Sequence, residues 1–216
     1  MSKKNHSQAA LLAQYRVALD NAKNQPEIAT EMAELGFDID TLNAGDQLLA
    51  QTRAAYDFKQ LEDDETVAAS TNFKEAKKQL ETYYRRHRKK ARVIYKNNPT
   101  ILKQLGIYNT VPYNYAGWLE TIRKFYTTND SAILKPLERL KITAEDMITG
   151  LNYIKIVEQA RSEFLKETGE SEDATKQKEK AFATLENWMQ EFYAVAAIAL
   201  EDHPQLMEAI GRKRKS

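Results

Sequence analysis

Apolar residues recur every three or four positions along most of the chain, a spacing that predicts amphipathic α-helices. Only seven Gly and five Pro interrupt the 216 residues, which favours long helices over β structure with many turns. The sequence therefore predicts an all-α protein. The clearest apolar stripes are Leu49, Thr52, Ala55 and Tyr56 in one half, and Ile154, Val157, Ala160 and Phe164 in the other.

The two halves of the chain match each other without a gap when one is shifted so that Asn98 lies over His203, a shift of 105 positions. At this shift "NPTILKQLG" (98–106) lies over "HPQLMEAIG" (203–211), with Pro and Gly in register. Sequence repeats of this kind indicate repeated structural units. We therefore predict a duplication, with repeat units at 9–108 and 117–213 joined by a linker at 109–116 and packed into one domain.

Each repeat unit is predicted to hold a long helical hairpin with shorter flanking helices. The acidic segments "EDDETVAAS" (62–70) and "TGESEDATK" (168–176) are expected to be the hairpin turns, since they are too polar to bury. Two such hairpins would form a four-helix core around a pseudo-two-fold axis. The expected helices are 9–23, 26–35, 39–61, 69–97 and a short one between Pro99 and Gly106, then 117–126, 131–140, 144–167, 174–201 and a short one between Pro204 and Gly211, with Asp38, Ser131 and Thr143 as caps.

Composition narrows the possible functions. The formal net charge of +1 gives no overall attraction to a polyanion, so any electrostatic argument must be local. The lack of Cys excludes disulfides and thiolate chemistry. The start of the chain does not resemble a secretory signal, and the longest apolar run, 192–200, is about half of what a membrane span needs. We therefore expect a soluble, cytoplasmic protein without a membrane partner.

One segment, "YYRRHRKKARVIYK" (83–96), holds seven Lys or Arg residues. At the repeat shift it lies over "WMQEFYAVAAIALE" (188–201), so the shared apolar positions define an inward face and predict a structural, partly buried His87. The more apolar second segment is expected to be covered and the basic one exposed. The predicted inward residues are Tyr83, Tyr84, His87, Ala91 and Tyr95, and the predicted outward ones are Arg85, Arg86, Lys89, Lys90 and Arg92.

Three functions remain open. The first is a non-catalytic binding or structural module, in which the charges only keep the helix solvated. The second is non-specific binding of nucleic acid, or another polyanion, through the basic helix 85–96 and the C-terminal "RKRKS" (212–216). No helix-turn-helix or RNA-binding fingerprint accompanies these charges. An acidic protein partner or a second copy of the chain could also meet the basic residues.

The third possibility, an enzyme with a site between the two repeat units, has little support in the sequence. His6, His87 and His203 match no metal-ligand spacing, so we expect no metal, cofactor or catalytic residue. "DIDTLNAG" (38–45) begins like a calcium loop, but its glycine comes too late, and the segment is interpreted as a helix start. Trp118 and Trp188 are expected to anchor the core.

Three stretches also resemble a bacterial family of duplicated helical proteins to which no activity has been assigned. They are "PEIATEMAELGFD" (26–38), "GWLETIRKFYTTNDSAILKPLERLKIT" (117–143) and "LENWMQEFYAVAAIALEDHPQLMEAIG" (185–211), of which the ending 204–211 is the most specific. The resemblance implies a helical tandem repeat and carries over no functional residues. This sequence departs from the pattern in its Arg- and Lys-rich helix.

Overall fold

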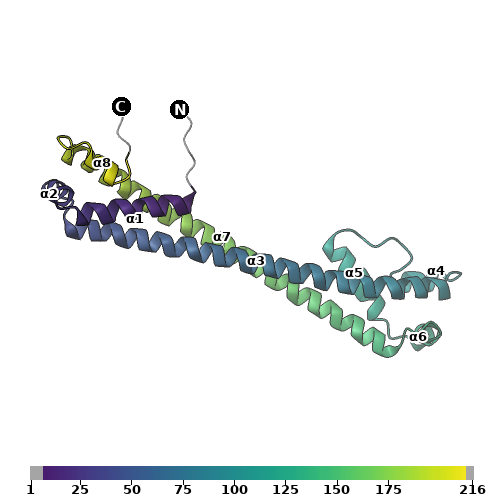
Figure 1. Ribbon diagram of the computed structural model, residues 1–216. Helices are drawn as coiled ribbons and strands as arrows, with labels where there is room; N and C mark the ends of the chain where they lie inside the picture. Colours follow the sequence, from purple (N-terminus) through teal and green to yellow (C-terminus); the bar gives the residue numbers. More distant parts are fainter. Residues whose placement is uncertain (1–6, 213–216) are drawn as a thin grey trace. The chain divides into compact units, whose positions relative to one another are not determined.

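The computed structural model describes residues 7–212, and this part of the chain is all-α (Figure 1). It contains helices and no strand, which confirms the predicted fold class. The helices are α1 (Gln8–Asn24), α2 (Pro26–Glu34), α3 (Ile39–Ile94), α4 (Pro99–Gln104), α5 (Tyr115–Tyr126), α6 (Ser131–Glu138), α7 (Ala144–Ala199) and α8 (Leu206–Ala209).

Two of these helices are far longer than predicted. α3 and α7 each run for 56 residues and continue through 62–70 and 168–176, so the two predicted hairpin turns are wrong. Segment 62–70 contains neither Gly nor Pro, and a helix that packs along one narrow seam needs few apolar residues. Ala69 and Ala174 are buried on that seam while most of their neighbours are exposed. Gly169 in mid-helix costs only about 1 kcal/mol.

The chain divides into two compact units, and neither follows the chain continuously. Unit 1 comprises residues up to 63 and from 170 onward, and unit 2 comprises residues 64–169. α3 passes from unit 1 into unit 2 after Asp63, and α7 returns to unit 1 after Gly169. Each unit therefore combines half of α3 with half of α7. The division into repeat units at 9–108 and 117–213 stays a prediction.

Within each unit the halves of α3 and α7 run antiparallel. In unit 2, Phe73 stacks on Phe164 with ring centroids 6.1 Å apart, and further along α3 Tyr83 contacts Tyr153 at 5.2 Å. Rising residue numbers on α3 thus meet falling numbers on α7. The corresponding pairs in unit 1 are Thr52 with the carbonyl of Ala181 (3.2 Å) and Asp63 with Ser171 (3.1 Å).

Each unit has its own apolar core. The shorter helices of the unit complete it: α1, α2 and α8 in unit 1, and α4, α5 and α6 in unit 2. Four of the five residues of the predicted inward face are buried, and the fifth, Tyr83, is half-buried. Of the two tryptophans expected to anchor the core, Trp118 is buried and Trp188 is half-buried. The expectation that 188–201 would be covered is wrong, since Ile198 is 64% exposed and Ala194 and Ala197 are also exposed.

Local signals at the helix starts mostly act as predicted. The Asp38 carboxylate accepts a hydrogen bond from the Thr41 amide at 2.9 Å, which makes 38–45 a capped helix start. The Thr143 hydroxyl accepts from the Asp146 amide at 3.2 Å and so caps α7. The predicted cap Ser131 is wrong, because the carboxylate of Asp130, one residue earlier, accepts from the Ala132 amide at 2.9 Å.

The turns that lead into α3 and α7 share one backbone geometry with different residues. Gly36 has φ 86° and Lys141 has φ 58°, and these positions are 105 apart. In both turns the next amide donates back to a carbonyl five residues earlier, Phe37 to Met32 at 2.9 Å and Ile142 to Leu137 at 3.2 Å. Glycine is the usual residue for this left-handed helix ending. Lys141 therefore holds a backbone conformation that is unfavourable for a side chain.

Candidate functional site

The net charge of the whole chain is close to zero because its two units carry opposite charges. Unit 2 contains 19 Lys and Arg against 12 Asp and Glu, a net charge of +7. The rest of the chain contains 13 Lys and Arg against 19 Asp and Glu, a net charge of −6, and the two values sum to the +1 of the whole. A local potential of this size attracts ions of opposite charge even when the total is close to zero. Unit 2 is therefore where an anionic ligand would be drawn.

The five predicted basic residues lie near the end of α3 in unit 2. Four are exposed and Lys90 is half-buried. Arg85 is paired with Glu81 at 2.6 Å, and the guanidinium of Arg86 lies 5.5 Å from the centroid of the Tyr83 ring. Within residues 7–212 no ion pair neutralises Arg86, Lys89, Lys90 or Arg92. Among the described residues, Arg86, Lys89 and Arg92 are thus exposed cations without an ion pair, whereas Arg85 is paired and Lys90 donates to the Lys141 carbonyl at 3.3 Å.

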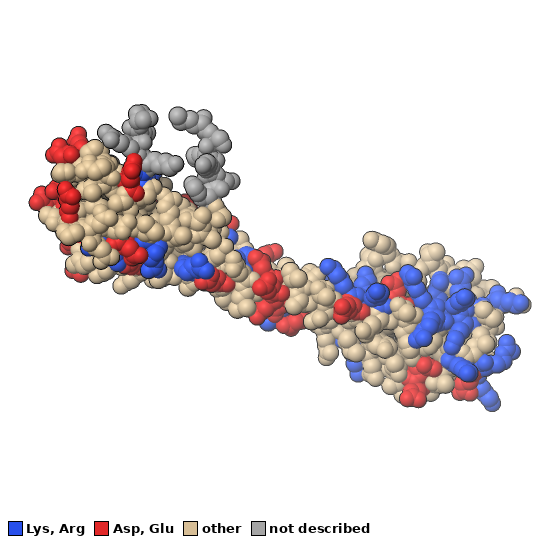
Figure 2. Space-filling view, viewed as in Figure 1, with Lys and Arg blue, Asp and Glu red and all other residues tan. Residues whose placement is uncertain are grey.

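Further cations from the neighbouring helices extend this set. Figure 2 shows Lys and Arg side chains gathered over the end of α3 and the adjoining α4 and α5. Grooves on this surface are lined in part by Lys and Arg side chains. One of about 450 Å³ is lined by Arg85, Arg88, Lys89, Arg92, Val93 and Lys96. Another of about 710 Å³ includes Lys103, Arg123 and Lys124, and a third of about 730 Å³ includes Lys135 and Arg139. We call the cations of these three grooves, with Arg86 and Lys90, the basic surface.

Sequence reasoning missed the cations outside α3, and also two tyrosines next to them. The segment 105–114 joins α4 to α5, and its residues from 109 onward were predicted only as a linker. Tyr108 is 46% exposed there and Tyr113 is fully exposed. Both tyrosines line grooves that also contain Arg or Lys side chains. The available signal was a pair of tyrosines without helical spacing in a segment that contains Pro and Asn.

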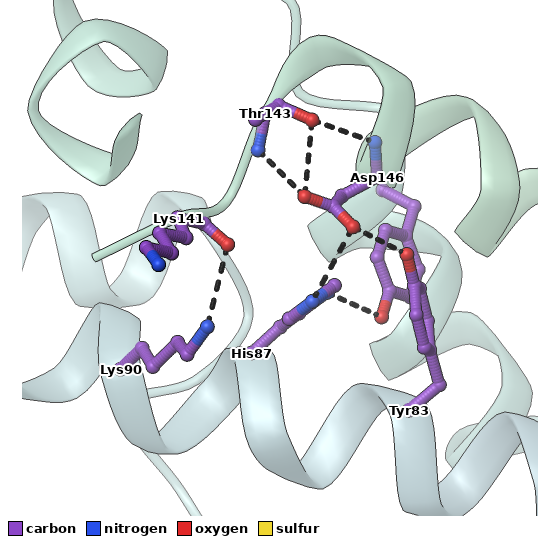
Figure 3. Close-up of polar contacts among 7 residues, drawn as sticks. Tyr83, His87, Lys90, Lys141, Thr143 and Asp146 are labelled. Carbon is purple, nitrogen blue, oxygen red and sulfur yellow. Dashed lines mark hydrogen bonds and ion pairs between the residues drawn. The ribbon is translucent and has the colours of Figure 1, made fainter. Parts of the chain in front are cut away.

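Beneath the basic residues, unit 2 contains a polar network built around His87 (Figure 3). The Asp146 carboxylate accepts hydrogen bonds from the Tyr83 hydroxyl at 2.7 Å and from the Thr143 amide at 2.9 Å. His87 Nε2 lies 3.9 Å from the same carboxylate, and His87 Nδ1 is 3.1 Å from the Tyr126 hydroxyl. At the positions 105 residues along, unit 1 has Trp188 and Phe192 in place of Tyr83 and His87, stacked with ring centroids 5.8 Å apart.

The network holds its groups in defined protonation states. Burial lowers the pKa of His87, and the nearby Lys90 and Arg86 lower it further against the opposing effect of Asp146. Burial and the hydrogen bond to Asp146 raise the pKa of Tyr83 to about 12. Burial opposes ionisation of Asp146, but the hydrogen bonds from Thr143 and Tyr83 outweigh it and lower its pKa. At neutral pH the histidine and tyrosine are thus uncharged and the aspartate is ionised.

This arrangement favours a structural role for His87, as predicted. Only 4% of the His87 residue surface is exposed, and it lines none of the grooves described above. Its hydrogen-bond partner is a tyrosine hydroxyl whose pKa is raised by burial, which makes a poor nucleophile. An enzyme with a site between the repeat units stays an untested alternative.

The C-terminal basic tail lies outside the described residues, apart from its first member. Arg212 lies over the Tyr193 ring at 4.1 Å, and its amide donates to the Met207 carbonyl at 2.9 Å. A contribution of 213–216 to binding stays a prediction. Between residues 7 and 212 no helix is both long and apolar enough to cross a bilayer. A cytoplasmic location stays a prediction.

Comparison with known proteins found no family model, curated protein or solved structure that matches this chain. The resemblance to a bacterial family of duplicated helical proteins therefore stays a prediction.

Proposed function

We propose that the protein is a non-catalytic binding module and that the basic surface of unit 2 binds the phosphate backbone of a nucleic acid. The observation that carries this proposal is the segregation of charge, with a net charge of +7 on unit 2 and −6 on the rest. Lys and Arg residues that neutralise phosphates release condensed counterions, which drives binding without reading sequence. The exposed Arg86, Lys89 and Arg92 are suited to this because no ion pair within 7–212 occupies them.

We further propose that the two halves of the chain arose by internal duplication and that only one copy acquired the basic residues. α3 and α7 begin at Ile39 and Ala144 and end at Ile94 and Ala199, so both ends differ by 105 positions. The five basic positions of α3 correspond at that shift to Gln190, Glu191, Ala194, Val195 and Ala197. A purely structural requirement for surface charge would apply to both copies. The difference between them supports a binding role for the basic copy.

The test is fluorescence anisotropy with a labelled oligonucleotide at several salt concentrations. Wild-type affinity should fall steeply as salt rises, with a slope of about −0.7 to −0.9 in log–log form for each phosphate contacted. Neutralising Arg86, Lys89 and Arg92 to Gln should weaken binding and reduce the slope by about 1 for each phosphate that the variant no longer neutralises.

A matched control removes the same charge from unit 1. Changing Lys176, Lys178 and Lys180 to Gln lowers the net charge by the same three units but leaves the basic surface intact. This control should bind as wild type does. Equal losses in both triple variants would show that only total charge matters, and absence of binding at low salt would refute the proposal. Far-UV circular dichroism would establish that both variants remain folded.

A further inference from the structure

Segment 105–114, which joins α4 to α5 in unit 2, presents aromatic side chains to solvent. Tyr113 is fully exposed, and no other ring of residues 7–212 packs against it. Tyr108 is 46% exposed, with the Lys103 ammonium 5.2 Å from its ring centroid. A single exposed apolar residue is common on protein surfaces. A fully exposed aromatic ring beside grooves lined by Lys and Arg side chains is less common and suggests a binding role.

The segment separates two grooves. One, of about 690 Å³, lies between the segment and α3, and its cations are Lys77, Arg85 and Arg88. The other is the groove of about 710 Å³ described above, with Tyr108 and cations from α4 and α5. Pro112 lines both grooves, and Tyr113, the next residue, lines the first of them. Both volumes are within the range of small-molecule sites.

The backbone of the segment is held in place by its neighbours. Arg88 of α3 donates a hydrogen bond to the Asn109 carbonyl at 2.7 Å. Asn114 caps α5 by accepting from the Gly117 amide at 2.8 Å. A side chain at Gly117 would approach Pro112 to 2.9 Å, which shows how closely the segment packs on the start of α5. The exposed ring therefore belongs to an ordered platform, and binding to it costs less entropy than ordering a free loop.

These features fit an unpaired base better than a duplex. Proteins that bind single strands combine a positively charged groove with aromatic rings on which bases stack. In a duplex the faces of the bases are hidden within the stack, so an exposed ring gains nothing from them. Each groove also contains a carboxylate: Glu81 in the first is paired with Arg85 at 2.6 Å, and Glu120 in the second is paired with Arg123 at 3.3 Å. These pairs reduce the repulsion of a phosphate but occupy the two arginines, which leaves the other cations of the grooves to contact it.

We propose that Tyr113 stacks on a base of single-stranded nucleic acid while the cations of the two flanking grooves contact the phosphates on either side. The proposal rests on the proposed function, because it names the kind of nucleic acid that the basic surface accepts. Tyr108 with Lys103 would contribute to the second groove. Specificity for single strands then arises from the tyrosine, and most of the affinity arises from the charges.

The experiment compares an unpaired oligonucleotide with a duplex of equal length by fluorescence anisotropy at near-physiological salt. Wild type should prefer the single strand. Changing Tyr113 to Ala should weaken single-strand binding by about 5-fold to 150-fold, the range that corresponds to the stacking of one base. Changing Tyr113 to Phe keeps the ring and should retain the affinity. Changing Phe58 to Ala removes an exposed ring from unit 1, where the residue is 44% exposed, and should have no effect.

The outcomes separate this proposal from the proposed function. If the Tyr113 to Ala variant binds single strands as wild type does, or loses duplex affinity equally, the stacking proposal is overturned while the charge-based function stands. If neither nucleic acid binds wild type, both proposals fail. The salt dependence of the affinity separates the two proposals in a second way. Tyr113 to Ala should leave the slope of log affinity against log salt concentration unchanged, whereas neutralising the cations should reduce it.

Discussion

Replacing Gly150 by Ala should destabilise unit 2, although the same replacement usually stabilises a helix. Gly150 lies within α7, and a Cβ there would clash with the Tyr126 ring. Tyr126 is 1% exposed, and its hydroxyl is 3.1 Å from His87 Nδ1. The edge of Phe125 contacts its ring at a centroid distance of 5.1 Å. The ring is thus confined, and the added methyl group has to displace packed atoms.

The expected size of the effect comes from a comparison within the same helix. Gly169 also lies in α7, and nothing is within 4 Å of a Cβ at that position. Gly169 to Ala should raise the free energy of unfolding by up to about 1 kcal/mol, the helix-propensity difference. Gly150 to Ala gains the same helix-propensity stabilisation, but its methyl group clashes with a packed ring, which costs about 1 to 3 kcal/mol. The two variants should therefore differ by about 1 to 3 kcal/mol, with Gly150 to Ala the less stable.

The assay is urea unfolding with a probe specific to each unit. Trp118 lies in unit 2 and Trp188 in unit 1, so a Trp188 to Phe background makes tryptophan fluorescence report unit 2 alone. Far-UV circular dichroism recorded in parallel would follow the helices of both units. If Gly150 to Ala is as stable as Gly169 to Ala, Tyr126 does not pack on α7 as described. A double variant that combines Gly150 to Ala with Tyr126 to Ala should no longer contain the clash. A coupling free energy near zero between these two substitutions would also contradict the packing.

Three further predictions test the continuous helix, the strained turn and the histidine network. Ala68 to Pro should lower the free energy of unfolding by about 3 kcal/mol or more and weaken the helical circular dichroism signal at 222 nm, because Ala68 lies inside α3. If the variant is as stable as wild type, segment 62–70 is a turn and not part of a helix. Lys141 to Gly should stabilise unit 2 by up to about 1 kcal/mol in urea unfolding, since φ 58° favours glycine; a destabilised variant would contradict the strain. Burial lowers the pKa of His87 below 6.5, so the unfolded chain binds a proton that the native state excludes. The contribution of His87 to the free energy of unfolding should therefore be constant above about pH 6.5 and fall as the pH drops below it. Stability should fall less steeply with decreasing pH in a His87 to Phe variant, and equal slopes would refute the assignment.

The sequence alone was sufficient for the short helices and for the starts of the two long ones. Pro26 and Pro99 open α2 and α4, Asp38 and Thr143 cap the long helices, and Gly106 has the positive φ (69°) expected where a short helix stops. These features depend on residues within one turn of helix, so local chemistry determines them. The apolar spacing identified part of the buried seam on both long helices. Of the two predicted stripes, Leu49, Thr52, Ile154 and Val157 are buried, and Ala55, Tyr56, Ala160 and Phe164 are half-buried.

The candidate site was only partly predictable. Arg85, Arg86, Lys89, Lys90 and Arg92 stand close together in the chain, and their outward position followed from the spacing of the apolar residues between them. Tyr113 gave no such signal, because full exposure of a ring depends on what the rest of the chain leaves uncovered. The cations of α4 to α6 join the same surface only through the fold of unit 2.

Tertiary structure decided whether the acidic segments became turns or helix. Segments 62–70 and 168–176 have the polarity of a loop, but packing along a seam that includes Ala69 and Ala174 keeps them helical. As a result α3 and α7 continue into a second unit, and each unit combines residues distant in sequence, such as Tyr83 with Asp146. Long-range contacts of this kind leave no mark in the local pattern, because the same polar, Ala-containing stretch satisfies either a turn or an exposed helix.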